Sequence, residues 1–477
     1  MGARRRASRI VWLWSVGFLG VAGTGAGGGG RALAAPDDAV TAARKGAIVR
    51  LEETATWCDR QRLFGARDRV LATILTLEPD HPRARSTLKY SRGPDGAWVR
   101  RSPYAAPPDW NRGLLPQVDE RVAAALTGYR DAVIASVTGE DVPLARREQA
   151  LDALVELLPA DRVVRELRGD VLVGDRWRMP ESVDGKRRRA ELRAVAVAAR
   201  RAFAARPPDD GSSGWTSALV ASGIRMYSSM HATVLGDVLR DTEAAFALAR
   251  VALERPPDAP LAVDTVYLLD DREQALKLIA RASKDPVRDV AAARLVSGTW
   301  LGDKAFVSYM ADPAVRGRAC ARAVVNGEIL AAFPTADGGF VEEGIGQRLL
   351  YLALDAHGPP FVTIEGTDLP GADDDEGEPL PTNPREWLPR AARVLQTDGA
   401  RRLGAVISAR LNAMTPANVL VAYALAAYLI EARPDRLRPF VEGLEATSDA
   451  SKLVEEVLAG DLASLAVRVR RYCLESD

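Results

Sequence analysis

Residues 340–349, Phe-Val-Glu-Glu-Gly-Ile-Gly-Gln-Arg-Leu, carry two adjacent carboxylates inside an apolar stretch. Apolar residues recur here at spacings of three and four, which predicts a helix over about 340–356. A second helix, predicted at roughly 313–332, contains Arg318-Ala319-Cys320-Ala321-Arg322-Ala323-Val324-Val325. Arg318 and Arg322 are four residues apart and therefore lie on one face of that helix. Glu343 follows Arg322 by 21 residues. These two segments are the central elements of the predicted fold and contain the candidate site.

The flanking segments predict a mixed domain that continues into helices. Strand-like alternation occurs at 218–225 and 228–235, and a buried-strand pattern at 261–269. Helical patterns occupy 237–253 and 271–282, and they run from 385 to the end of the chain. We therefore expect an α+β fold with mostly helix. Residues 215–384 form its α+β part, and residues 385–477 form an all-helical C-terminal part.

Residues 37–206 predict a helical-repeat region with two related units. The link Leu77-x-Pro79-x-x-x-x-Ala84 resembles the connection between helices of tetratricopeptide-type hairpins. A related segment runs from Pro159 to Trp177, and each unit is expected to end in a short strand that carries a Trp, at 98 and 177. Residues 207–214, rich in Pro, Gly and Ser, are interpreted as a linker and as the main domain boundary. The run of four basic residues at 186–189 is interpreted as a solvated helix face.

Residues 1–34 predict a secretory signal. Four arginines precede an apolar segment of about a dozen residues, which is short for a spanning helix, and Ala32-Leu33-Ala34 is a small-x-small cleavage site. We expect cleavage after Ala34 and export to the periplasm or beyond, with retention as an uncleaved anchor as the alternative. No later stretch is apolar enough to predict a second span, so no membrane span is expected after removal of the signal.

Composition narrows the class of protein. Hydrophobic residues make up 47% of the 477 residues and charged residues 27%, which excludes a disordered chain. Basic and acidic residues are equal at 64 each, so no nucleic-acid partner is expected. Removing the signal takes away five arginines and leaves a mildly acidic chain. Three His and three Cys are too few for a multi-Cys zinc domain or a disulfide scaffold. Buried thiols are expected for Cys58, Cys320 and Cys473. A disulfide between one pair of them is the alternative, and the sequence does not say which pair.

From about 215 to 474 the order of elements resembles the catalytic domain of gluzincin metallopeptidases, in the peptidase-MA-like form found in exported bacterial proteins. Residues 340–349 resemble that family's apolar-x-x-Glu-Gly-Leu-Ala helix, whose Glu is the third zinc ligand, which would be Glu343. Residues 423–429 resemble its downstream Tyr-rich helix, and 439–444 and 460–472 resemble its closing helices. No single piece is specific, and the resemblance depends on their order.

The decisive motif departs from the family pattern. Gluzincins carry His-Glu-x-x-His about 20 residues before the zinc-binding Glu, and the Glu between the two His is the general base. Here Arg318 and Arg322 occupy the two His positions and Ala319 occupies that of the base. A guanidinium is always protonated and has no lone pair to give to a metal. The resemblance therefore implies a degenerate domain with no catalytic residue, no cofactor and no metal ligand.

We expect the degenerate cleft to comprise Arg318, Ala319, Arg322, Glu342 and Glu343. A guanidinium–carboxylate pair could replace the metal and line a groove that still holds a peptide, a protein segment or an acidic ligand. The favoured function is binding or scaffolding in the cell envelope. One alternative is an active peptidase or hydrolase with a rearranged site that uses Glu342, Glu343 and a distant His, and another is a purely structural protein.

Other features have simpler interpretations. His231 falls in a strand pattern and is expected to be partly buried, and His357 is expected to cap a helix end. The acidic stretch 365–378 lacks the spacing of an EF-hand and is interpreted as a solvated loop. The partner and the oligomeric state do not follow from the sequence.

Overall fold

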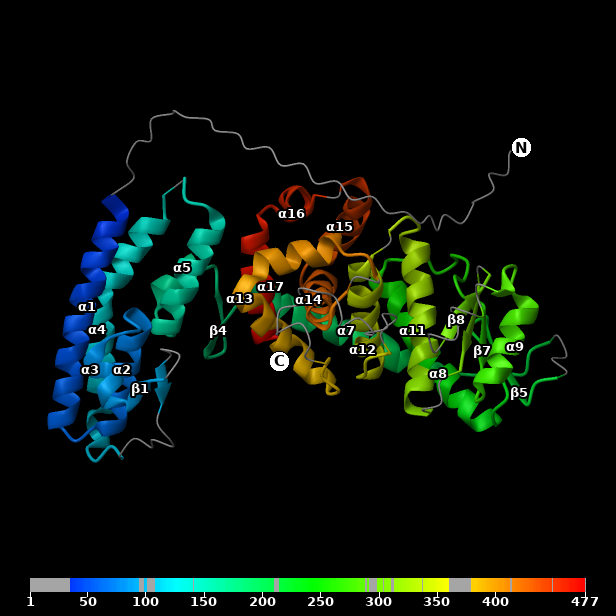
Figure 1. Cartoon of the computed structure of the whole chain (residues 1–477), viewed down its shortest axis with the longest axis horizontal. Coiled ribbons are helices and arrows are strands. Elements are labelled where there is room, and N and C mark those ends of the chain that lie inside the picture. The colour runs from blue at the N-terminus through cyan, green and yellow to red at the C-terminus, as the bar shows by residue number, and fades with distance from the viewer. Residues whose placement is uncertain are drawn as a thin grey trace.

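The computed structural model describes residues 35–476 except 94–97, 101–107, 140, 210–213, 288–289, 291–297, 303, 310–312, 337, 360–378, 412–413 and 448. The predicted signal 1–34, part of the predicted linker and the acidic stretch 365–378 therefore lie outside the described residues. The elements follow one another along a long axis: two helical units at one end, a helical layer in the middle and a β-sheet at the other end (Figure 1). The fold is α+β and mostly helical, as predicted.

The N-terminal region consists of two copies of one unit. Each copy has two longer helices, a short third helix and an antiparallel hairpin of two strands. The first copy comprises α1 (Ala35–Arg60), α2 (Phe64–Leu77), α3 (Pro82–Thr87), β1 (Tyr90–Arg92) and β2 (Trp98–Arg100). After the 3-10 turn η1 (Arg112–Leu114), the second comprises α4 (Leu115–Val137), α5 (Leu144–Leu157), α6 (Arg162–Leu167), β3 (Val171–Val173) and β4 (Arg176–Arg178). The Trp of each unit lies on the second of two strands, where the sequence predicted only one.

Corresponding helices of the two units are offset by 80 residues. α2 and α5 begin 80 residues apart, as do α3 and α6. His81 and Asp161 cap the short third helix of each unit by accepting a hydrogen bond from the backbone N–H three residues later. Arg85 and Arg165 each donate from Nε to the carbonyl six residues earlier. The same local interactions therefore build both units, and residues 80 apart can be compared directly.

Helix α7 (Pro180–Ala202) belongs to the second domain. It packs against α8 (Ala232–Ala252) and against the C-terminal helices, and its Leu192 and Ala196 lie in the same hydrophobic core as Leu248 and Leu425. The boundary between the two compact parts therefore falls near residue 179, before α7. The predicted domain limit at 207–214 instead separates α7 from the sheet that follows, because a Pro- and Gly-rich connection need not coincide with a boundary between hydrophobic cores.

The sheet of the second domain has five strands in the order β5-β6-β7-β9-β8. They are β5 (Ser217–Ala221), β6 (Ile224–Ser228), β7 (Thr265–Leu268), β8 (Gly298–Leu301) and β9 (Ala305–Ser308). The central strands β6, β7 and β9 are parallel, and each edge strand pairs antiparallel with its neighbour. Val266 and Leu268 of β7 face the core made with α8 and α11 (Pro313–Ala332). Tyr267 faces the opposite core, made with α9 (Arg272–Ala282).

Two strand predictions in this region need correction. The alternation at 218–225 is interrupted at Ser222 and Gly223, whose φ angles of 46° and 86° form the tight turn between β5 and β6. The second predicted strand, 228–235, is wrong because β6 ends at Ser228 and α8 begins at Ala232. His231 is consequently exposed and caps α8, accepting from the N–H of Thr233.

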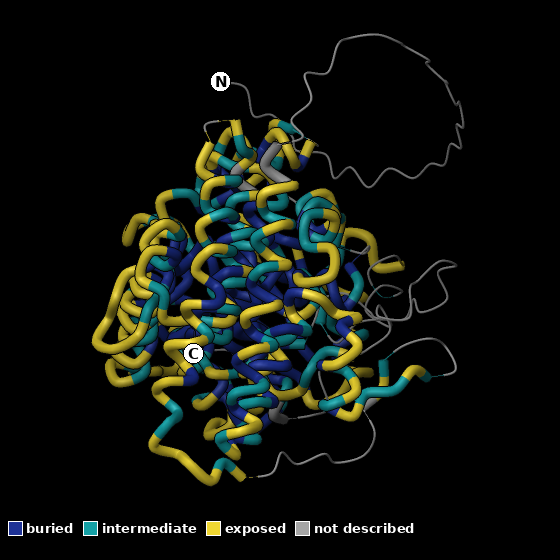
Figure 2. Tube along the Cα trace, turned by 90° about the vertical axis from the view of Figure 1, so that its left-hand side faces the viewer, coloured by how far each residue is buried: buried dark blue, intermediate teal, exposed yellow. Residues whose placement is uncertain are grey.

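The helical layer consists of α12 (Gly346–Leu354) and the C-terminal helices. After the 3-10 turn η4 (Pro384–Glu386), these are α13 (Trp387–Ser408), α14 (Pro416–Ala427), α15 (Pro434–Ala446), α16 (Ala450–Leu458) and α17 (Leu462–Glu475). Two π-helical segments interrupt the layer: η2 (Phe340–Ile345) before α12 and η6 (Tyr428–Ala432) after α14. Every residue of α14 is buried, and Figure 2 shows the buried chain concentrated in the middle of the molecule.

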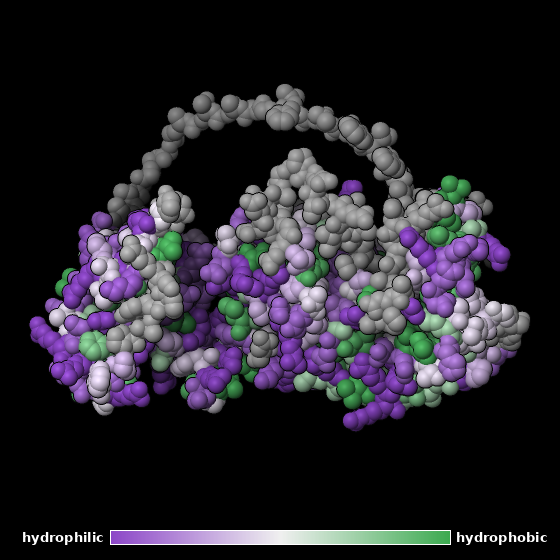
Figure 3. Space-filling model, turned by 60° about the horizontal axis from the view of Figure 1, so that its bottom comes forward, coloured by the Kyte–Doolittle hydropathy of each residue, from purple (hydrophilic) through white to green (hydrophobic). Residues whose placement is uncertain are grey.

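Two further properties of the described residues bear on the sequence predictions. All three thiols are buried, and no disulfide joins Cys58, Cys320 and Cys473. No helix in the described part of the chain has the length and apolar character to cross a membrane. The face shown in Figure 3 is mostly hydrophilic, with small separate hydrophobic areas.

Candidate functional site

Helix α11 lies between the sheet and the helical layer, and this position determines the environment of Arg322. Cys320 and Val324 pack into the core beneath the sheet, whereas Ala321 and Val325 pack into the core of the helical layer. A helix with apolar contacts on both sides leaves no path to water for a side chain between them. Arg322 is accordingly 0% exposed and is among the largest fully buried side chains of the described residues.

Arg322 forms a buried ion pair with Glu343. Its Nη2 lies 2.7 Å from Oε2 of Glu343, and both side chains are 0% exposed. The same nitrogen donates to the carbonyl of Glu342 at 3.0 Å. Glu343 lies in the π-helical segment η2, where the wider turn shifts the register of the side chains that follow. The guanidinium therefore supplies the opposite charge that a buried carboxylate needs.

The chain after α12 closes over the ion pair. Oε1 of Gln347 accepts from the N–H of Gly358, and Nε2 of Gln347 donates to the carbonyl of Gly358, both at 3.0 Å. Nε2 also lies 3.4 Å from Oε2 of Glu343. A Cβ at residue 358 would lie 2.9 Å from Cδ of Arg322, so only glycine permits this approach. Gln347 thus connects the ion pair to the segment that covers it.

The structure brings together most of the predicted site residues. Arg322 meets the carboxylate of Glu343 and the backbone of Glu342. Arg318 donates from Nη1 to the carbonyl of His357 at 3.2 Å, and Ala319 is buried. The expectation of an open, salt-bridged groove is wrong for the ion pair itself, because both partners are sealed from solvent. Peptide binding at this point would require the covering segment to move.

His357 is a buried member of this cluster, and the prediction that it caps a helix is wrong. Asp355, with a φ of 53°, ends α12 instead. The imidazole of His357 lies on Trp387, with ring centroids 3.6 Å apart, and meets the edge of Tyr423. Burial, and then the positive charges of nearby arginines led by Arg348, lower the pKa of His357 to about 2. The imidazole is therefore neutral at physiological pH.

A second buried ionic cluster lies deeper in the helical layer and was not predicted. Glu431, in the π-helical segment η6, is 0% exposed and pairs with Arg348 of α12 and with Arg189 of α7. Tyr472 donates to Glu431 at 2.7 Å, and Arg348 donates to the hydroxyl of Tyr423 at 2.7 Å. Burial alone would raise the pKa of Glu431, but the charges of Arg348 and Arg189 hold it below its usual value. The cluster joins helices from three distant parts of the chain.

The sequence contains a signal for this cluster. Arg348 and Glu431 are single charges in apolar runs, and a charge in a buried helix needs an opposite partner. Their mutual pairing, across 83 residues, does not follow from the sequence. The solvated-face interpretation of residues 186–189 is wrong for Arg189, whose Nε lies 2.8 Å from Oε2 of Glu431.

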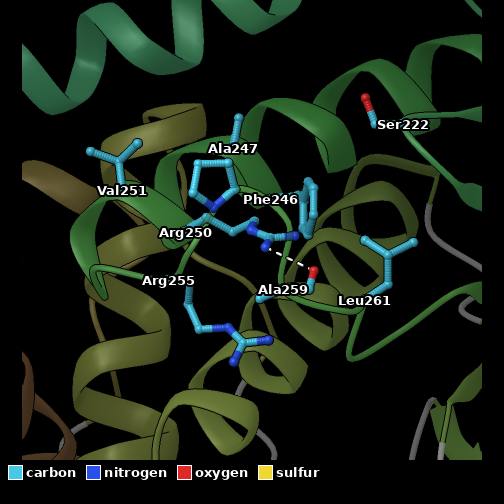
Figure 4. A pocket seen from close by; sticks show the side chains of 9 residues that line it. Ser222, Phe246, Ala247, Arg250, Val251, Arg255, Ala259 and Leu261 are labelled. Carbon is cyan, nitrogen blue, oxygen red and sulfur yellow. Dashed lines mark hydrogen bonds between the residues drawn. The ribbon is translucent and has the colours of Figure 1, made fainter.

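A cavity of about 530 Å³ opens beside the sheet, and Figure 4 shows the side chains that line it. It is lined by Ser222, Phe246, Ala247, Arg250, Val251, Arg255, Pro257, Ala259 and Leu261. Arg250 donates to the carbonyl of Ala259 at 2.9 Å, and Arg255 pairs with the buried Glu328 at 3.2 Å. Both arginines thus hold the loop after α8 in place.

Comparisons with known proteins give no assignment. No protein-family model matches the chain, and neither does a curated protein or a solved structure. In the described part of the chain, no group of three or more His, Cys, Asp or Glu side chains is arranged to hold a metal ion.

Proposed function

We propose that the chain is an exported protein whose second domain has the architecture of a gluzincin metallopeptidase and works without catalysis, in binding or scaffolding in the cell envelope. The observation that supports this proposal is the fully buried pair between Arg322 and Glu343. The two residues come from the two segments that resemble the zinc-binding helices of that family. A sheet of mixed strands followed by α11 and α12 is compatible with such a domain.

The side chains at these positions do not fit a zinc ion. A catalytic zinc site needs three protein ligands with lone pairs and one open position. Arg322 supplies a cation instead, and its contact of 2.7 Å occupies the oxygen that Glu343 would give to the metal. Ala319, at the position of the general base, has no group that accepts a proton. We therefore derive no hydrolytic step at this site.

Metal analysis and a hydrolysis assay test the proposal directly. The purified protein, prepared with zinc in the medium, should contain far less than one zinc per chain and should not cleave a mixture of unstructured peptides. Stoichiometric zinc that is lost in Glu343→Gln would overturn the proposal. So would peptide cleavage that is lost in the same variant, and this second result would support the alternative of a rearranged hydrolase.

Restoring the family motif tests the resemblance itself. The triple variant Arg318→His, Ala319→Glu, Arg322→His recreates His-Glu-x-x-His opposite Glu343. If α11 and η2 correspond to the zinc helices, this variant should bind one zinc ion per chain. Adding Glu343→Gln to it should strongly weaken zinc binding, because a catalytic zinc site needs three protein ligands. A folded triple variant whose zinc binding does not depend on Glu343 would show that the positions do not correspond.

Export is a separate part of the proposal. Expressed with residues 1–34 in a bacterial host, the protein should be recovered outside the cytoplasm with Ala35 as its first residue. A protein that remains in the membrane fraction and keeps its first residues would favour the uncleaved anchor.

A further inference from the structure

A groove on the first helical unit has an occupied counterpart on the second. The groove, of about 520 Å³, lies over α2, α3 and the start of β1. It is lined by Gly65, Asp68, Arg69, Ala72, Leu75, Thr76, Arg85, Leu88 and Tyr90. All of these residues belong to the first unit, so the groove is independent of the buried ion pair in the second domain.

In the second unit, the C-terminal helix α17 covers the corresponding face. α17 packs against α5, and the two are neighbours in Figure 1. Arg471 of α17 forms an ion pair with Asp170, whose side chain is 0% exposed. Arg168 connects the same Asp170 to Asp152 of α5. Arg468 of α17 is the positive charge that most lowers the pKa of Glu148 of α5, against the larger effect of burial, which raises it. A helix therefore docks on this face through its arginines.

The offset of 80 residues relates the two faces position by position. Asp170 pairs with Arg471 of α17, Arg168 links Asp170 to Asp152, and the charge of Arg468 acts on Glu148. The first-unit counterparts of Glu148, Asp152, Arg168 and Asp170 are Asp68, Ala72, Leu88 and Tyr90. All four counterparts line the groove. The structure thus shows what this surface receives when it is occupied: one face of an α-helix.

We propose that the groove of the first unit binds an amphipathic helix supplied by a partner protein, docked as α17 docks on the second unit. The chemistry of that helix follows from the differences between the faces. Asp152 and Asp170, which are acidic, are replaced by Ala72 and Tyr90, and an exposed arginine, Arg69, stands where the second unit has an exposed Gln149. The groove is therefore less acidic and more apolar than its counterpart.

The partner helix should consequently present aliphatic side chains and a carboxylate. Leu75, Leu88 and Tyr90 supply an apolar floor, and the guanidinium of Arg85 lies 4.5 Å from the ring centroid of Tyr90. A carboxylate at the place of Arg471 would meet Arg69 and Arg85, whereas another arginine there would meet like charge. The basic α17 itself is thus the wrong ligand for this groove.

The test uses two peptides with the sequence of α17, residues 462–475, and the purified chain from Ala35 onward. Both carry Cys473→Ser, and one also carries Arg468→Leu and Arg471→Glu. Each labelled peptide is titrated with protein and followed by fluorescence anisotropy. We expect the acidic peptide to bind with a dissociation constant on the order of 100 µM, since a short free peptide must also become ordered. The peptide that keeps Arg468 and Arg471 should bind at least tenfold more weakly.

Matched variants locate the binding. Arg69→Glu should weaken binding of the acidic peptide at least tenfold. Gln149→Glu, which places a Glu at the corresponding position of the second unit, should leave that binding unchanged. Ala72→Asp, which restores the acid found at 152, should narrow or reverse the preference between the two peptides. Residues 69, 72 and 149 are exposed, so these variants should fold. No binding of the acidic peptide at 1 mM, or binding that is unaffected by Arg69→Glu, would overturn the proposal.

Discussion

Removing either partner of the Arg322–Glu343 pair should destabilise the protein by about 3–5 kcal/mol. The size follows from the geometry, since the charged atoms are 2.7 Å apart and neither side chain reaches solvent. Glu343→Gln leaves a guanidinium that cannot release its proton, so this cost should be the same at pH 5 and pH 8. Arg322→Met leaves the carboxylate of Glu343 buried without this counter-charge.

The two single variants should therefore lose stability by similar amounts, because each leaves one charge of the pair buried without the other.

Urea unfolding followed by circular dichroism measures each variant. The double variant Arg322→Met, Glu343→Leu removes both charges and should lie within about 1–2 kcal/mol of the natural protein, far less than the two single effects combined. Glu273→Gln removes the exposed Glu273–Lys277 pair and should cost less than about 0.5 kcal/mol. Additive single effects, or single effects as small as this control, would refute the buried-pair interpretation.

Three further predictions concern other buried charges. Burial is the main cause that raises the pKa of Glu148 to about 7 at the contact with α17, where Arg468 and Arg471 oppose the shift and Asp152 and Asp461 add to it. Its charged form therefore costs stability increasingly above about pH 4.5, and Glu148→Gln should raise the free energy of unfolding by about 1–2 kcal/mol at pH 8, after allowance for solvent screening, and leave it unchanged at pH 4. With a pKa of about 2, His357 stays neutral when the folded chain is acidified, whereas the unfolded chain binds a proton below about pH 6.5. The natural protein should therefore lose about 1.4 kcal/mol per pH unit more than His357→Phe does between pH 6 and pH 4, and parallel acid-denaturation curves would contradict this. Glu431→Gln leaves Arg348 and Arg189 facing each other without a counter-charge and should cost about 3–5 kcal/mol in urea unfolding, whereas Glu442→Gln, at an exposed pair with Arg438, should cost less than about 0.5 kcal/mol.

Local sequence patterns were sufficient to predict many of the helices of the second domain. Helical patterns predicted helices at roughly 313–332 and 340–356, where the structure has α11 and then η2 followed by α12. The strands β8 and β9 were not predicted. The alternation of apolar and polar residues at 218–225 continued through the turn between β5 and β6. That turn needs positive φ angles at Ser222 and Gly223, and an alternating pattern does not predict them.

Long-range contacts explain the remaining differences. His357 follows a correctly predicted helix end, but its burial depends on Trp387, 30 residues later. Arg189 belongs to a basic run that resembles a solvated face, and its partner Glu431 lies 242 residues away. The boundary before α7 likewise depends on which core receives Leu192. In each case the local sequence gives the residue and its element, while the contact that defines its role comes from packing.

Glu343 and Glu431 are buried carboxylates of the helical layer, and arginine side chains neutralise both of them. Glu343 and Glu431 each lie in a π-helical segment, and each meets a guanidinium from another helix. Because an unpaired charge costs several kcal/mol while joint replacement by apolar residues costs little, neither partner can be changed alone and stability does not require the pair. What the pairs do fix is the relative position of the helices, since a guanidinium donates to a carboxylate in only a few orientations. Arg322 therefore sets how α11 lies against η2, and Arg348 and Arg189 set how α12 and α7 lie against η6.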